Sequence, residues 1–184
     1  SLPGVYLVSL FVQSNLGCID RDSMNLVVNP LPTANFGFVK NVCLDNPTQF
    51  TDSTLLIGAN IASWQWNFGN GKNSFNQKTF STYSNSGTYN VTLTVTSSNG
   101  CVDSITTPVT IYELPDANFG VNGVCEGVNS LFIDSSTVGG SNISNWLWDF
   151  GDSNTDTTQF PSHTYNTSGT YTVTLTVQSA QGCS

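Results

Sequence analysis

Three carboxylates crowd one short polar segment, and they are the first side chains whose type and spacing suggest chemistry. Asp149, Asp152 and Asp156 could offer oxygen ligands to Ca²⁺, which takes six to eight of them. Asp and Asn in a tight turn also accept hydrogen bonds from the nearby backbone. The matching segment earlier in the chain has the uncharged Asn67 and Asn70. This difference favours turn stabilisation, so we expect no cofactor, with calcium as the weaker alternative.

The other residues able to do chemistry lack the partners that catalysis needs. His163 is the single histidine, so a zinc site or a histidine-based triad has too few members. We expect His163 to make a structural hydrogen bond. Each of the five cysteines falls at a repeated position, which indicates framework residues and not nucleophiles. The sequence therefore predicts that the segment is not an enzyme.

Charge and hydropathy exclude two classes of partner. The chain has four Lys and Arg residues, a formal net charge of -8 and a pI of about 4.1. So few cations cannot follow a phosphate backbone, and we expect no nucleic acid partner. No apolar run approaches the roughly 20 residues that span a bilayer, so we expect no membrane insertion.

A repeat with a period of 82 or 83 residues organises the chain. The sequence at residues 64–71, which contains two tryptophans, returns at 146–153, and 31–37 returns at 114–120. Self-similarity at a fixed period indicates an array of small modules. We therefore predict the end of one repeat at 1–30, a complete repeat at 31–113 and a repeat without its last strand at 114–184. Two explanations fit a sequence that starts and ends inside a repeat. It is either a piece of a longer array, or a subunit whose incomplete repeat is completed by strands of another copy.

The repeats alternate between apolar and polar residues, as half-buried strands do. The strand at 87–95 recurs at 169–177 and at 4–12, and no segment has helical periodicity. Short strands separated by Asn, Gly, Ser and Pro indicate antiparallel two-sheet sandwiches, so the predicted fold class is all-β. We expect four aromatic residues to anchor the cores: Trp66, Trp148, Tyr89 and Tyr171. Trp64 and Trp146 are the tryptophans expected to be partly exposed.

The segment WDFGD at 148–152, followed by HTY at 163–165 and GTYTVTL at 169–175, resembles the polycystic-kidney-disease (PKD) domain. This resemblance covers the whole chain and implies tandem immunoglobulin-like sandwiches, which we expect to form a rod. The middle repeat departs from the family pattern at Asn67, Asn70 and Ser81, where Asp, Asp and His are frequent. The cysteine-bearing variant resembles PKD arrays in large surface proteins of the Bacteroidota, including gliding adhesins, which are commonly exported by the type IX system.

Five cysteines in a chain with the features of a secreted protein indicate disulfides. Pairing within each repeat would join Cys43 to Cys101 and Cys125 to Cys183. The first cysteine of each pair lies between the first and second strands, and the second lies at the turn between the sixth and seventh strands. In an immunoglobulin-like sandwich these two places lie at opposite ends, whereas bridged Cα atoms lie within about 7 Å. The end of one module meets the start of the next in a head-to-tail array. We therefore expect a bridge between repeats, Cys43 to Cys183, and keep the pairing within repeats as the alternative.

The function predicted from these features is structural: a stalk or filament segment of a secreted bacterial surface adhesin, stiffened by disulfides and short junctions. The expected partners are neighbouring repeats of the same chain or other copies in a filament, and surface glycans. Binding of carbohydrate or protein, and a role as an accessory domain of a secreted hydrolase, are the alternatives. Four sites resemble the Asp-Ser/Thr glycosylation sites of Bacteroidota, and their acceptors are Ser23, Ser53, Ser104 and Thr157.

Overall fold

The computed structural model describes residues 2–184, and this part of the chain is all-β, without a helix. Sixteen strands form five sheets. Consequently, no helix among the described residues is long and apolar enough to cross a membrane. By their contacts the residues fall into two compact units: the first holds 1–38, 49–81 and 90–108, and the second holds 39–48, 82–89 and 109–184.

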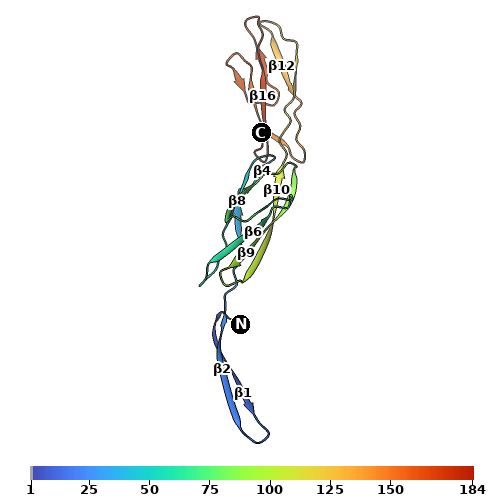
Figure 1. Cartoon of the computed structure of the whole chain (residues 1–184). Coiled ribbons are helices and arrows are strands. Elements are labelled where there is room, and N and C mark those ends of the chain that lie inside the picture. The colour runs from blue at the N-terminus through green and yellow to red at the C-terminus, as the bar shows by residue number, and fades with distance from the viewer. Residues whose placement is uncertain (1) are drawn as a thin grey trace. The chain divides into compact units, whose positions relative to one another are not determined.

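The first strands form a long antiparallel hairpin, drawn in blue in Figure 1. β1 (Gly4–Gln13) pairs with β2 (Ile19–Val28) along its whole length. The turn between them runs through Gly17, whose φ of 84° lies in the left-handed region that glycine adopts readily. These strands repeat the sequence of β9 (Gly87–Ser97) and β10 (Val102–Tyr112), but most of their side chains are exposed.

The middle repeat contains two sheets. The larger has the order β4-β10-β9-β6-β7, and the smaller has the order β3-β5-β8. Figure 1 shows β6, β9 and β10 running side by side. Pairing is antiparallel between β6 and β9 and parallel between β4 and β10. The strands are β3 (Phe36–Phe38), β4 (Val42–Cys43), β5 (Thr48–Asp52), β6 (Ile61–Asn67), β7 (Asn73–Ser74), β8 (Lys78–Ser81), β9 (Gly87–Ser97) and β10 (Val102–Tyr112).

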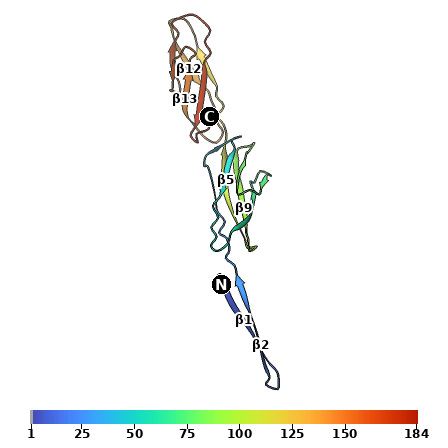
Figure 2. The same ribbon diagram turned by 60° about the vertical axis from the view of Figure 1, so that its left-hand side comes forward.

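The last repeat has the same kind of two-sheet arrangement, with orders β11-β12-β15 and β14-β13-β16. β12 and β13, which belong to different sheets, are visible from another side in Figure 2. The register of β13 on β16 matches that of β6 on β9, including a shift at the start of each strand. The strands are β11 (Phe119–Asn122), β12 (Asn129–Asp134), β13 (Ile143–Asp149), β14 (Thr155–Asp156), β15 (Ser162–Thr164) and β16 (Thr174–Ser179).

Aromatic residues fill the space between the sheets of each repeat. In the middle repeat Trp66 is completely buried, and its ring lies 5.2 Å from that of Phe36 and 5.9 Å from that of Phe50. In the last repeat Trp148 is also completely buried and packs against Phe132 at 5.7 Å. Burying a tryptophan of about 200 Å² at about 25 cal/mol per Å² contributes about 5 kcal/mol before entropy is counted. Each small core therefore depends strongly on one indole.

The tyrosines differ from the expectation that Tyr89 and Tyr171 anchor the cores. Both are only half-buried, whereas Tyr83 and Tyr165 are 1% and 4% exposed. The rings of Tyr89 and Tyr171 lie 4.5 and 4.2 Å from the buried tyrosines. Tyr89 lies at the start of β9 and Tyr171 lies just before β16, so each ring packs on a buried tyrosine and covers the core without entering it.

Candidate functional site

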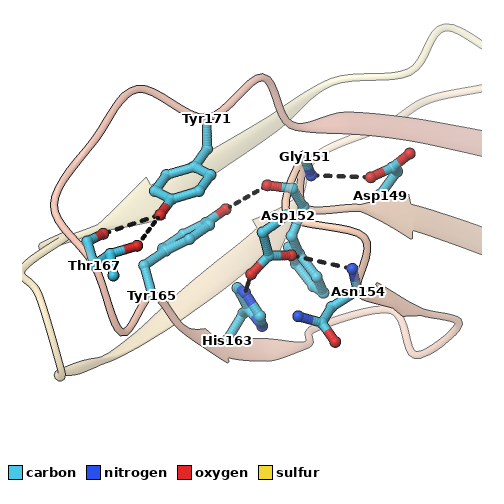
Figure 3. A network of polar contacts seen from close by, with 9 residues as sticks. Asp149, Gly151, Asp152, Asn154, His163, Tyr165, Thr167 and Tyr171 are labelled. Carbon is cyan, nitrogen blue, oxygen red and sulfur yellow. Dashed lines mark hydrogen bonds and ion pairs between the residues drawn. The ribbon is translucent and has the colours of Figure 1, made fainter.

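The polar turn after β13 is held by hydrogen bonds from the backbone to two of the carboxylates (Figure 3). Asp149 accepts a bond from the backbone N–H of Gly151 at 2.9 Å. Asp152 accepts one from the backbone N–H of Asn154 at 3.1 Å. A third bond runs from the Phe150 amide to the Asn154 carbonyl. Each aspartate thus satisfies a backbone donor two residues further on, as Asx turns do.

His163 links this turn to strand β15. Its Nε2 lies 2.8 Å from Oδ2 of Asp152, and both side chains are mostly buried, with 13% and 19% exposed. Figure 3 shows Asp152 directed toward the histidine ring. The imidazole also stacks on Phe150, with ring centroids 4.2 Å apart and planes within 4° of parallel. The single histidine therefore has a bonding partner and a packing partner, both structural.

The middle repeat makes the same contacts with uncharged residues. Asn67 accepts a bond from the Gly69 amide at 2.9 Å, and Asn70 accepts one from the Lys72 amide at 3.0 Å. The side-chain amide of Asn70 donates to Ser81 at 3.2 Å, where the last repeat has the Asp152–His163 pair. Because neutral side chains build the same turn, its geometry does not require a charge or a metal.

Glycine is required at the centre of both turns. Gly69 and Gly151 have φ angles of 73° and 76°, in the left-handed region. A Cβ at Gly151 would lie 2.5 Å from the backbone oxygen of Thr172, and one at Gly69 would lie 3.0 Å from that of Asn90. Each turn therefore packs closely against the backbone of a neighbouring segment: Asn90 in β9 for the middle repeat, and Thr172 just before β16 for the last repeat.

The carboxylates do not gather into a metal site. Among residues 2–184, no group of three or more His, Cys, Asp or Glu side chains is placed to hold a metal ion. The third candidate ligand, Asp156, accepts bonds from the backbone and the hydroxyl of Thr158, both at 2.7 Å. Each of Asp149, Asp152 and Asp156 thus accepts a hydrogen bond within its own turn, which favours turn stabilisation, and the weaker calcium alternative stays a prediction.

Hydrogen bonding sets the protonation of this region. Desolvation is the largest single effect on the pKa of Asp152 and raises it. The hydrogen bonds from His163 and Asn154 together outweigh desolvation, so the pKa of Asp152 is lowered. For Asp156, the bonds from Thr158 are the largest influence and lower its pKa. Both groups are therefore held as carboxylates in the folded protein to a lower pH than in the unfolded chain.

The tyrosines next to the turn close the end of the sandwich. Tyr165 donates its hydroxyl to the carbonyl of Phe150 at 2.9 Å, which ties the turn to the buried ring. Loss of solvent, then the nearby Asp152 charge, raises the pKa of Tyr165, so its hydroxyl remains a donor. In Figure 3, Tyr171 lies over Tyr165 and bonds to Thr167, donating to its carbonyl at 3.0 Å. The site thus consists of bonds that fix chain geometry.

Trp64 and Trp146, expected to be partly exposed, are half-buried. The indole N–H of Trp64 donates to Asp52 at 2.8 Å, and that of Trp146 donates to Asp134 at the same distance. The two repeats therefore use these residues in the same way, as a link between the two sheets. Sequence reasoning missed both aspartates, although their spacing of 82 residues is a signal that could have identified them.

A disulfide joins Cys43 to Cys183, which are 140 residues apart in the sequence, with a Cα–Cα distance of 5.6 Å. Both cysteines belong to the second compact unit, and they are 9% and 1% exposed. Cys43 lies in β4 of the middle repeat, and Cys183 follows β16 of the last repeat. The bridge therefore connects segments from two repeats, and the pairing within repeats is absent from the described residues.

Comparison with known proteins agrees with the repeated sandwich and its WDFGD turn. The family model described as PKD domain matches residues 29–111 and 113–184, which is most of the chain. This chain belongs to the PKD domain family. PKD domains are non-catalytic modules, so this PKD segment is not an enzyme.

Several similar proteins come from Vibrio. The PKD chain is 39% identical over 57 residues to the pre-pro-metalloprotease PrtV of Vibrio cholerae, and the match spans only 6% of that relative's length. The PKD1 domain of the same protease has a crystal structure with 28% identity and a TM-score of 0.41, covering 45% of this chain and 98% of that domain. The PKD1 domain of Vibrio anguillarum Epp is 26% identical with a TM-score of 0.42, covering 46% and 96% respectively.

The four glycosylation candidates are all exposed. Ser23 lies on β2 and Ser104 on β10, whereas Ser53 and Thr157 each follow a strand directly. An exposed hydroxyl is accessible to a modifying enzyme, and substitution there leaves the core unchanged. Their modification stays a prediction.

Proposed function

We propose that this PKD segment is a stalk or filament segment of a secreted surface adhesin, in which disulfides between repeats carry load. The observation that supports this proposal is the Cys43–Cys183 bridge. A bond between two repeats limits how one can move against the other.

The position of the bridge makes the mechanical role specific. Tension applied at the chain ends enters at the first residues, reaches Cys43, crosses the disulfide to Cys183 and leaves through Ser184. The residues enclosed by the bridge lie outside this covalent path. They include every core residue from Phe50 to Val177. We infer that the bridge protects the enclosed strands, β5 to β16, from unfolding under load.

Further bonds of the second compact unit lie beside the segment that joins the two repeats. Ser86 donates to Glu113 at 2.8 Å, and the amide of Leu44 donates to the carbonyl of Tyr112 at 2.8 Å. The Glu113 carboxylate also packs against Gly139, where a Cβ would clash with it. The joining segment is thus fixed on both sides, as a spacer with little freedom requires.

Electron spin resonance can test the spacer proposal with two labels in the second unit. Ser84 and Thr157 are exposed and belong to different repeats. Labels at these positions, with Cys18, Cys101 and Cys125 replaced by serine, are expected to give one narrow distance distribution. The matched control carries Cys43→Ser and Cys183→Ser as well, and its distribution should be broader. A broad distribution in the bridged protein contradicts the proposal.

The likeness to PrtV favours a second candidate, an accessory domain of a secreted hydrolase. A binding surface for polysaccharide or protein is then expected, with Trp64 or Trp146 as its aromatic residue. Pull-down of the purified segment on insoluble polysaccharides distinguishes the two roles. The stalk proposal expects no retention, whereas retention that Trp146→Ala abolishes supports the accessory role.

We further propose that the parent protein belongs to the Bacteroidota, lies on the cell surface and is exported by a type IX system. The support is the resemblance of the cysteine-bearing repeats and the exposure of the four Asp-Ser/Thr acceptors. Mass spectrometry of protein from the native cell provides the test. Glycan mass on Ser23, Ser53, Ser104 or Thr157 supports the proposal, and four unmodified peptides contradict the glycosylation.

A further inference from the structure

Three cysteines occupy the same turn, with the sequence Ser-x-x-Gly-Cys. In each, the serine amide donates to the cysteine carbonyl at 2.8 Å, and the cysteine amide donates to the serine hydroxyl at 3.1 to 3.2 Å. The preceding glycines have φ angles of 84°, 78° and 87°. We call these the cysteine turns: 14–18, 97–101 and 179–183. The three turns therefore share the same hydrogen bonds and the same glycine conformation.

The other two cysteines occupy a second shared structure. The carbonyl of Cys43 accepts a bond from the Asn46 amide at 3.1 Å, and that of Cys125 accepts one from the Val128 amide at 3.1 Å. The amide two residues after each cysteine donates to a buried tyrosine's carbonyl, at 3.1 Å and 2.8 Å respectively. We call these the cysteine loops: 43–46 and 125–128. In both loops the residue at the third position has a backbone φ in the left-handed region.

One turn and one loop are already bonded to each other, through Cys43 and Cys183. This disulfide joins the cysteine loop of the middle repeat to the cysteine turn of the last repeat. It therefore shows that a loop and a turn from different repeats can come close enough to be bonded. The thiols of Cys18, Cys101 and Cys125 are free, and Cys18 and Cys125 are exposed while Cys101 is partly covered. Each chain therefore has one accessible loop cysteine and one accessible turn cysteine of the kinds already bonded.

We propose that Cys125 of one copy forms a disulfide with Cys18 of a second copy. The contact repeats the loop-to-turn pairing of Cys43 with Cys183, and it joins copies head to tail. Because every copy has one partner of each kind, the reaction continues along a series of copies. Backbone geometry carries this inference, which holds whether or not the segment bears load.

The reaction needs an oxidant, and a low-molecular-weight disulfide supplies it. The Cys125 thiolate attacks the small disulfide, forming a mixed disulfide and releasing one small thiol. The Cys18 thiolate of the second copy then attacks Sγ of Cys125, forming the bridge and releasing the second small thiol. Two protein thiols lose two electrons and two protons in total, and one small disulfide is reduced to two thiols.

The experiment uses equal amounts of unlabelled and ¹⁵N-labelled protein, both with Cys43–Cys183 intact, in a buffer of oxidised and reduced glutathione. We expect a ladder of multimers on non-reducing gels that collapses on reduction. Peptide mapping should link the Cys18 peptide to the Cys125 peptide with mixed isotopes, which identifies bonds between copies. Cys101→Ser is the matched control and should leave the ladder unchanged, whereas Cys18→Ser and Cys125→Ser should each abolish it.

Several outcomes overturn the proposal. Monomers carrying only glutathione adducts show that the two structures do not associate. Twice as much Cys18–Cys125 peptide as Cys18–Cys18 or Cys125–Cys125 peptide, which is the proportion expected by chance, shows random reaction of exposed thiols. A ladder that persists in Cys125→Ser assigns the bond to another cysteine. The spin-label test of the stalk role uses protein without these three thiols, so either proposal can fail without the other.

Discussion

The Cys43–Cys183 bridge should determine how far the PKD segment lengthens under tension. With handles at the two ends, only residues 1–43 and 183–184 lie on the covalent path, about 45 residues that extend to about 150 Å at roughly 3.4 Å each. The loop that the bridge encloses spans a sequence separation of 140. At the same rise per residue it contains about 480 Å of chain that tension cannot reach.

Single-molecule pulling measures this difference directly. The protein carries Cys18→Ser, Cys101→Ser and Cys125→Ser, so that only the bridged pair remains, and the control replaces Cys43 and Cys183 with serine as well. We expect the bridged protein to lose the β1–β2 hairpin and the short pairing of β3 with β5, and to extend by at most about 150 Å. The control, or the bridged protein after reduction, should release about 480 Å more. Release of several hundred ångströms by the bridged protein without a reductant refutes the load path.

Three further predictions concern the turn and the core. Gly151→Ala should lower the free energy of unfolding by about 1 to 3 kcal/mol or more, because it adds backbone strain and a contact at 2.5 Å. The control Gly120→Ala, whose Cβ meets no atom within 4 Å, should change the free energy of unfolding far less. Urea denaturation measures both. Trp148→Ala should lower the same free energy by about 3 to 5 kcal/mol, and a loss below 1 kcal/mol would contradict its role as an anchor. The pKa of Asp152 is lowered from 3.8 in the folded state, so its stabilisation is present above pH 3.8 and is lost as the pH falls through the folded pKa. Thermal melts should therefore show a smaller acid-induced loss of Tm for Asp152→Asn than for the wild type, and identical pH profiles would exclude the His163 bond as a cause.

Much of this fold can be predicted from the sequence because its signals are local. Alternation along residues 87–95 indicates a half-buried strand, and β9 covers these residues. The periodicity of two places both indoles of each Trp-x-Trp segment on the inner face, and the tryptophan nearer the strand start is the one expected to be partly exposed. Turn glycines such as Gly151 can also be predicted, since a left-handed position in a tight turn has few alternatives to glycine.

The candidate site was less predictable, because its partners are brought together by the sheets. No local pattern indicates that Asp134 accepts the indole proton of Trp146, or that Tyr165 and not Tyr171 enters the core. Asp149, Asp152 and Asp156 lie close together in the sequence, yet each accepts a hydrogen bond from a different backbone N–H group. Proximity along the chain was therefore a poor guide to shared ligand binding.

By itself the sequence determined the repeat, the all-β class, the inner faces of the strands and the absence of a histidine-based catalytic group, since all of these follow from composition or from spacing of two residues. Only the tertiary structure decided which cysteines pair. Two schemes were compatible with the spacing, and the choice depends on which turn meets which loop. A contact between residues 140 apart in the sequence produces no local sequence pattern, because it depends on the path of every strand between them.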